Sequence, residues 1–298
     1  MSAPDVNPTV RDDRRFIALD IDGTILLEDG TLTDPVLEAV HRVRDLGHEV
    51  TLATGRSVAM TLPVLERLDL TPQYVICCNG AITLERDASA PVGYRRIHVE
   101  TFIPREVLTT IRRSLEHGAF AVEDETGLYR YSGQFPDGSI SGTAEQVEFD
   151  ELLDRPATRV VVLSPNHGTE EFLDIVERMG LHKVSYNVGW TAWLDIAPDG
   201  VNKSTAAERV RASLGIPRDR VVAVGVGWQD RGHEEGAVLD IEPRRAFDLL
   251  HPLTSSPQKD TDRQFPAGHQ DLAWANCRWS SALRTINKST ESPDRTST

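Results

Sequence analysis

Short apolar runs alternate with helix-like stretches along residues 16–225 of this 298-residue chain. The first run, Phe-Ile-Ala-Leu at residues 16–19, follows a polar segment and predicts a buried central strand of a parallel sheet. Residues 34–47 have valines at helical spacing and predict a helix with Asp34 as its N-cap. Residues 49–53 predict the next strand, so the chain begins with a right-handed strand–helix–strand unit of an α/β fold.

Beyond residue 84 the pattern repeats strand and helix twice, which predicts a small open sheet with helices on one face. The predicted strands are residues 94–98, segments near Phe120 and Leu128, residues 159–163 and residues 183–187; the predicted helices are residues 104–117 and 169–179. Residues 131–148 are rich in glycine and serine and predict a loop. We expect residues 193–196 to return the chain to the first sheet.

A third strand–helix pattern closes the regular part of the sequence. Asn202 or Ser204 can cap a helix that extends to Leu214, and residues 221–225 predict another buried strand. Lys203 falls in the first turn of this helix, where its charge opposes the helix dipole. A cation in this position favours an anionic ligand, and helix amides with a lysine form a phosphate site. A solvated lysine on a helix surface is the alternative.

Candidate chemistry lies at the carboxyl ends of these strands, where open α/β sheets place their sites. Asp20 and Asp22 directly follow the first strand, and Gly23 allows the chain to turn there. Two carboxylates suit a nucleophile paired with a general acid/base, and they also suit Mg²⁺. The alternative is a solvated turn; a calcium-binding loop is excluded because its glycine position is Ile25.

The second strand ends in Thr54, Gly55 and Arg56. A hydroxyl and a glycine amide at a strand end can hold a phosphate oxygen, and Arg56 adds positive charge nearby. An ordinary strand-to-helix turn is the alternative for this segment taken alone. The functional interpretation therefore depends on the order of these segments along the chain more than on any single segment.

Together the segments DIDGT at 20–24, ATGR at 53–56, CNGA at 78–81, DGVNKS at 199–204 and VVAVG at 221–225 resemble the haloacid dehalogenase superfamily of phosphatases. About 150 residues separate Thr54 from Lys203, which is enough for an inserted domain, and this resembles the Cof-type branch. The resemblance implies a Rossmann-like core with a parallel sheet, helices on both faces and an inserted α/β cap. The implied division is a flexible N-terminus at 1–14, core at 15–83, cap at 84–190, core at 191–245 and a poorly ordered tail at 246–298.

The resemblance also implies roles for individual residues. Asp20 is expected to be the nucleophile and a magnesium ligand. Asp22 is expected to be the general acid/base, with its backbone carbonyl also on Mg²⁺, and Asp230 is expected to be a further metal ligand. Thr54, Gly55 and Lys203 are expected to bind the phosphoryl oxygens. The implied activity is magnesium-dependent hydrolysis of small phosphorylated metabolites, such as sugar phosphates or cofactor phosphates, through an aspartyl-phosphate. Substrate choice is expected in the cap, where the sequence singles out no residue.

The fourth motif departs from the family pattern. Val226 stands where the family places a magnesium-binding aspartate, Gln229 replaces an asparagine, and Asp230 is kept. A valine cannot bind a hard cation. Three explanations stay open: a catalytically impaired protein that binds phosphorylated metabolites, a truncated or frameshifted product whose C-terminal part is an artefact, or an active enzyme in which Asp230 and water replace the missing ligand.

The composition limits the classes of binding partner that we expect. The formal net charge of −14, without a compensating basic run, argues against nucleic acid or an anionic membrane as a partner. The three cysteines have neither disulfide nor zinc spacing, and Cys77 and Cys78 are expected to be core residues in a reducing compartment. The polar N-terminus shows no signal peptide, so we expect a cytoplasmic protein. The sequence does not specify an oligomeric state.

Overall fold

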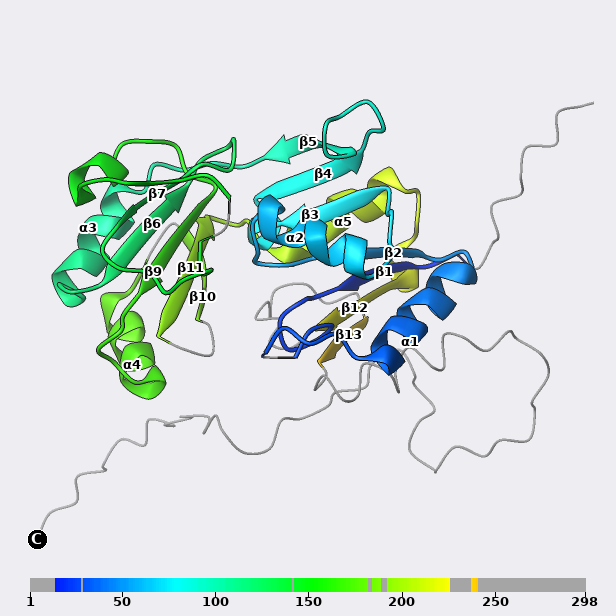
Figure 1. Ribbon diagram of the computed structural model, residues 1–298, viewed down its shortest axis with the longest axis horizontal. Helices are drawn as coiled ribbons and strands as arrows, with labels where there is room; N and C mark the ends of the chain where they lie inside the picture. Colours follow the sequence, from blue (N-terminus) through cyan, green and yellow to red (C-terminus); the bar gives the residue numbers. More distant parts are fainter. Residues whose placement is uncertain are drawn as a thin grey trace, which may run out of the picture. The chain divides into compact units, whose positions relative to one another are not determined.

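The structure, a computed structural model, describes residues 14–27, 29–140, 142–181, 184–188, 192–225 and 237–240. A parallel sheet carries the first motifs (Figure 1), and its strand order is β13-β12-β1-β2. These strands are β1 (Phe16–Leu19), β2 (Glu49–Leu52), β12 (Val221–Gly225) and β13 (Ala237–Asp240). β1 is fully buried and pairs with β2 on one side and with β12 on the other. The apolar run at residues 16–19 is therefore the central strand that the sequence predicted.

A second group of strands continues from β2. β3 (Tyr74–Cys77) runs parallel to the end of β2 through a bridge between Ala53 and Ile76, and it pairs antiparallel with β4 (Ile82–Arg86). β5 (Tyr94–Val99) pairs in turn with β4. The predicted strand at residues 94–98 is thus confirmed as β5, and its partners are β4 and, beyond it, β3.

Helices cover both faces of the parallel sheet, as predicted. Ile17 and Leu19 pack in a hydrophobic cluster with residues of α1 (Asp34–Asp45) and α2 (Val58–Arg67). Phe16 and Ala18 point to the other face and pack against α5 (Lys203–Ser213). This separation follows from the alternation of side chains along a strand. It fixes α5, and with it Lys203, on the opposite side of the sheet from α1.

The start of α1 differs by one residue from the prediction. Its N-cap is Thr33, in extended conformation, whereas Asp34 lies in the first turn and Pro35 follows it. An acidic side chain in the first turn is favourable because it interacts with the positive end of the helix dipole. The prediction of Asp34 as N-cap was wrong, and the dipole interaction explains why an aspartate fits there equally well.

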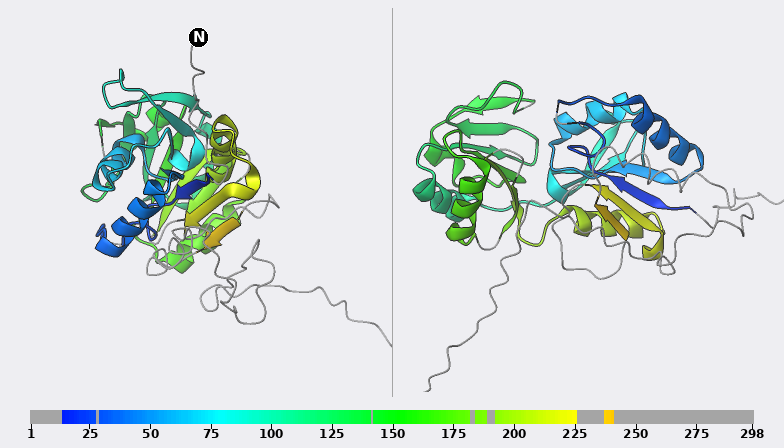
Figure 2. Two further views of the ribbon diagram at one scale, coloured as in Figure 1. Left: turned by 90° about the vertical axis from the view of Figure 1, so that its right-hand side faces the viewer. Right: turned by 90° about the horizontal axis from the view of Figure 1, so that it is seen from below.

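A six-stranded sheet follows in the sequence, with strand order β10-β11-β9-β6-β7-β8. Its strands are β6 (Ala119–Glu123), β7 (Tyr129–Ser132), β8 (Ala144–Gln146), β9 (Arg159–Leu163), β10 (Val184–Val188) and β11 (Trp193–Pro198). α3 (Arg105–Ser114) and α4 (Thr169–Met179) lie on one face of it (Figure 2) and share a hydrophobic cluster with Phe120, Val162 and Leu194. Short 3₁₀ segments occur at Cys78–Gly80, Phe149–Leu152 and Arg218–Arg220.

Two details of this sheet differ from the predictions. The segment at residues 131–148, predicted as a loop, contains β8, whose three exposed residues pair parallel with β7 at the edge of the sheet. An exposed polar edge strand carries no apolar alternation, so the sequence pattern could not reveal it. The residues predicted to return the chain to the first sheet instead lie in β11, between β10 and β9. The division of the chain into core and cap at residues 84 and 190 stays a prediction.

Candidate active site

The candidate site begins where β1 ends. The backbone N–H of Asp20 donates to the carbonyl oxygen of Val224 at 2.8 Å, which continues the pairing of β1 with β12 by one residue. The Asp20 side chain is buried, and its Oδ1 accepts the backbone N–H of Ile21 at 2.8 Å. Gly23 has a φ of +70°, so the predicted turn is present and brings the exposed Asp22 round after the strand.

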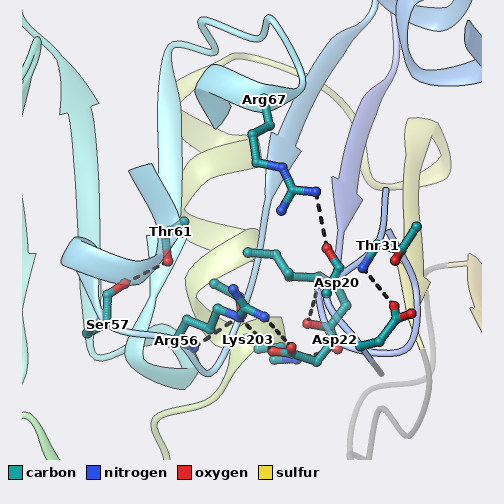
Figure 3. A network of polar contacts seen from close by, with 12 residues as sticks. Asp20, Asp22, Thr31, Arg56, Ser57, Thr61, Arg67 and Lys203 are labelled. Atoms are coloured by element: carbon teal, nitrogen blue, oxygen red, sulfur yellow. Dashed lines mark hydrogen bonds and ion pairs between the residues drawn. The ribbon is translucent and has the colours of Figure 1, made fainter. Parts of the chain in front are cut away.

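Lys203 reaches Asp20 from the start of α5. Asn202 caps this helix, because its side chain accepts the backbone N–H of Thr205 at 2.7 Å. The cap places Lys203 in the first turn, and its Nζ donates to Oδ2 of Asp20 at 2.7 Å (Figure 3). The structure thus brings together the predicted nucleophile and one of the predicted phosphate ligands, with both carboxylate oxygens of Asp20 accepting hydrogen bonds.

Thr54 lies two residues beyond the end of the neighbouring strand β2 and is fully buried. Its Oγ1 accepts the backbone N–H of Arg56 at 3.1 Å, and its own N–H donates to Ile76 at 3.0 Å. Because β1 and β2 pair in register up to Leu19 and Leu52, Asp20 and the Thr54 loop leave the sheet at the same edge. This is the geometry that parallel strands impose on residues at their carboxyl ends.

Arg56 makes a contact that the sequence did not reveal. Its Nε lies 2.9 Å from Oδ2 of Asp22, and its Nη2 lies 2.5 Å from Oδ1, so the guanidinium holds the carboxylate through both oxygens (Figure 3). The sequence suggested only that Arg56 adds positive charge near a phosphate. Residue spacing carries no signal for this pair, which joins two loops 34 positions apart.

The segment Cys78–Gly80 borders the Thr54 loop. Two backbone hydrogen bonds join them, from Cys78 N–H to the carbonyl of Arg56 at 2.9 Å and from Asn79 N–H to that of Thr54 at 3.0 Å. Burial raises the pKa of the Cys78 thiol well above its usual value, and that of Cys77 to about 12. Since the thiolate is the nucleophilic form of cysteine, burial disfavours reaction of these two thiols.

The donor set can be compared with the needs of Mg²⁺. This ion prefers one or two carboxylates, with water and substrate oxygens completing its octahedron. Asp20 supplies a carboxylate and Asp22 a backbone carbonyl oxygen in the loop after β1, and the carboxylates of both residues already contact cationic side chains. These two residues fit Mg²⁺. The third predicted ligand, Asp230, lies outside the described residues, as do Val226 and Gln229, and no group of three or more potential metal ligands occurs within the described part of the chain.

Comparisons with known proteins identify the family. The profile described as haloacid dehalogenase-like hydrolase matches residues 17–231, which is more than half of the chain. The chain is 28% identical over 224 residues to the 5-amino-6-(5-phospho-D-ribitylamino)uracil phosphatase YitU of Bacillus subtilis, covering 70% of this chain and 79% of that protein. It is 27% identical over 254 residues to the pyridoxal phosphate phosphatase YbhA of Escherichia coli, covering 79% and 90%.

Solved structures agree on the fold. A haloacid dehalogenase-like hydrolase from B. subtilis superposes with a TM-score of 0.60 at 17% identity, covering 80% of this chain and 99% of that one. The sugar phosphatase BT4131 of subclass IIB superposes with a TM-score of 0.57 at 18% identity, covering 72% and 81%. None of the helices among the described residues is long and apolar enough to cross a membrane.

Proposed function

This chain belongs to the haloacid dehalogenase-like hydrolases and is a phosphatase, and from this premise we propose that it hydrolyses small phosphorylated metabolites through Asp20, with Mg²⁺ as cofactor. The contact between Lys203 and Asp20 supports this most directly, because it places a cation and a carboxylate at one strand end. A phosphoryl group carries negative charge and has to meet a carboxylate nucleophile there. The lysine reduces the repulsion between them.

In the proposed first step, the carboxylate of Asp20 attacks phosphorus, an aspartyl-phosphate forms and the bond from phosphorus to the leaving oxygen breaks. Asp22 donates a proton to the leaving oxygen. In the second step Asp22 accepts a proton from water as the water attacks phosphorus, the acyl-phosphate bond breaks, and phosphate leaves with Asp20 regenerated. Each step is an in-line displacement that depends on positioning and on stabilisation of charge.

Thr54, Gly55 and Lys203 are proposed to hold the phosphoryl oxygens. The hydroxyl oxygen of Thr54 already accepts a hydrogen bond from Arg56 N–H, so its own hydrogen is oriented away from that amide and can be donated to the substrate. Gly55 has no side chain to obstruct an oxygen beside the backbone. Asp20, the backbone carbonyl of Asp22 and Asp230 would hold Mg²⁺, which when bound neutralises charge on the phosphoryl group.

The proposal also covers the classes of substrate and the location of the protein in the cell. The two named relatives act on a phosphoribitylamino-uracil and on pyridoxal phosphate, so sugar phosphates and cofactor phosphates are the first classes to assay. The net charge of −14 favours a small anion bound at local cations over a nucleic acid partner. A cytoplasmic location stays a prediction from the polar N-terminal sequence.

The alternative is a catalytically impaired protein that binds phosphorylated metabolites, and Val226 is the observation that favours it. The experiment is phosphate release from an aryl phosphate and from a panel of sugar and cofactor phosphates, with Mg²⁺ and with EDTA. It compares the natural chain with its Asp20→Asn and Val226→Asp variants.

We expect magnesium-dependent release by the natural chain that Asp20→Asn abolishes. Turnover by Val226→Asp alone would support the impaired protein. No turnover by either chain, with both folded by circular dichroism, would overturn the phosphatase proposal.

A further inference from the structure

Cys78, Asn79 and Gly80 have φ values of +52°, +51° and +97°, so three successive residues lie in the left-handed region. Glycine adopts this region without cost and asparagine enters it as a single residue, whereas a residue such as Cys78 requires stabilisation by its surroundings. Two non-glycine residues in a row in this conformation are therefore held there by neighbouring contacts. Strained backbone of this kind concentrates at functional sites, and here it turns Asn79 toward the Thr54 loop.

The contacts that hold this segment come from both proposed phosphate-binding segments. On one side, backbone hydrogen bonds join Cys78 and Asn79 to Arg56 and Thr54. On the other side, Gly80 packs so closely against the N-cap of α5 that a Cβ added to it would lie 2.2 Å from the carbonyl oxygen of Asn202. Asn79 thus lies between the loop that follows β2 and the helix start that carries Lys203.

The side chain of Asn79 lies directly over Gly55. A Cβ added to Gly55 would be 3.0 Å from Oδ1 of Asn79 and 3.2 Å from Nδ2, so the amide fills the space that a side chain at position 55 would need. Asn79 is only 8% exposed, and within the described residues its side-chain amide makes no hydrogen bond. The amide atoms of Asn79 are not among the fully buried polar atoms without a partner, so they reach solvent beside Gly55. Two N–H donors that are open to solvent and held by no protein group are available to a ligand there.

We propose that Asn79 is a further substrate-binding residue, whose side-chain amide donates to an oxygen of the phosphorylated substrate held at Thr54 and Gly55. The inference rests on the proposed phosphatase function and extends it to a residue outside the predicted site. Gly55 takes part by leaving room for the amide beside the backbone.

The test uses three variants of the full chain. Asn79→Gly removes the amide, and glycine accepts the φ of +51° without strain. Asn79→Asp keeps the shape and replaces the N–H donors by a carboxylate. Asp69→Gly is the control, because Asp69 has a φ of +48° and lies on the surface outside the site. The readouts are KM and kcat for an aryl phosphate, the inhibition constant of inorganic phosphate, the thermal shift that inorganic phosphate produces, and the urea unfolding midpoint.

We expect Asn79→Gly to raise KM and the inhibition constant of phosphate about tenfold, which corresponds to one lost hydrogen bond to a charged group. Asn79→Asp should weaken phosphate binding further, because the new carboxylate repels the negatively charged phosphate. The unfolding midpoint of Asn79→Gly should not fall, and Asp69→Gly should leave KM and the inhibition constant unchanged. A purely structural role for Asn79 would lower the unfolding midpoint and leave KM unchanged.

The outcomes separate the two proposals. If the natural chain turns over and Asn79→Gly keeps both constants within twofold, the inference is overturned and the phosphatase proposal stands. If the natural chain does not turn over, the thermal shift decides: loss of the phosphate-induced shift in Asn79→Gly supports the inference, and its retention overturns it. A natural chain that neither turns over nor shifts with phosphate overturns both.

Discussion

The Nζ atom of Lys203 lies 2.7 Å from Oδ2 of Asp20, although 183 positions separate the two residues. Both side chains are mostly buried, with 15% and 8% of their surfaces exposed. Removing one partner of such a pair leaves a charge with little water around it, whereas removing both charges together is much less costly. The contact therefore links the catalytic proposal to a measurable stability.

We expect Lys203→Met and Asp20→Asn each to lower the free energy of unfolding, and the double variant to be less destabilised than the sum. The expected interaction energy is about 1–3 kcal/mol, typical of residues in direct contact. The free energies of unfolding of the natural chain, the two single variants and the double variant are measured by urea denaturation in EDTA, which removes bound metal. Additivity within about 0.5 kcal/mol would show that the pair contributes nothing to folding.

Two buried threonines of the same segment provide a matched test of phosphate binding. Thr54→Val removes the proposed donor while keeping the shape, and we expect kcat/KM to fall ~100-fold, as for the loss of one preorganised donor. Thr54→Ser should keep most of the activity.

Thr51 is equally buried and donates to the carbonyl of Tyr74. Thr51→Val should lower the free energy of unfolding by about 1 kcal/mol and leave kcat/KM unchanged. Equal losses of activity in the Thr51→Val and Thr54→Val variants would contradict a specific role for Thr54.

The role of Asp22 can be tested through the leaving group. A general acid matters most when the leaving oxygen is strongly basic, so Asp22→Asn should slow hydrolysis of alkyl phosphates more than that of a nitrophenyl phosphate. The expected loss is about 100-fold or more for the alkyl substrates. Because Asp22 is exposed, the variant should lose less than about 1 kcal/mol of stability. The same fractional loss for both substrate classes would rule out proton donation by Asp22.

Much of this site was predictable because it lies at strand ends. Sequence patterns mark β1 and β2, and in a parallel sheet their carboxyl ends share one edge, so local motifs at Asp20 and Thr54 were sufficient to predict neighbours in space. The start of α5, and thus the place of Lys203, had a local signal as well. Asn202 and Ser204 were the alternative caps, and the cap is Asn202.

Other features depend on tertiary structure and have no local signal. The contact of Arg56 with Asp22 depends on how two loops turn after their strands. Asparagine accepts the left-handed region readily, but Cys78 before it has no such preference, and its φ of +52° depends on the backbone hydrogen bonds to the Thr54 loop. β11 was misplaced because a strand that returns to a first sheet and a strand central to a second one have the same apolar pattern.

Gly80 should be intolerant of any side chain. A Cβ would meet Asn202 at 2.2 Å, and the φ of +97° is unfavourable for alanine. We expect Gly80→Ala to lower the free energy of unfolding by about 2–5 kcal/mol, from conformational strain and overpacking together. Gly93, with a φ of +74° and no atom within 4 Å of an added Cβ, is the control and should lose only about 1–2 kcal/mol as alanine. Similar losses at both positions would show that the contact with Asn202 relaxes freely.

A buried carboxyl group leads to a prediction about pH. Glu123 of β6 is 1% exposed, and its Oε2 accepts the hydroxyl of Tyr129 at 2.7 Å and lies 3.5 Å from Sγ of Cys78. Burial raises the pKa of Glu123, although the positive charges of Arg159 and Arg96 oppose this shift. The folded protein therefore binds the proton of this carboxyl group more tightly than the unfolded chain does.

The sign of the effect follows from this shift. Stability from the protonated group is fully present below the pKa of an unfolded glutamate, about 4.3, and is lost as pH rises through the higher pKa of the folded state. Glu123→Gln keeps the shape and stays neutral at every pH. Its free energy of unfolding, measured against that of the natural chain in urea from pH 4.5 to 8, should therefore rise with pH. A constant difference between the two chains would mean that Glu123 titrates alike in the folded and unfolded states, and that the hydrogen bond from Tyr129 and the charge of Arg159 fully offset its burial.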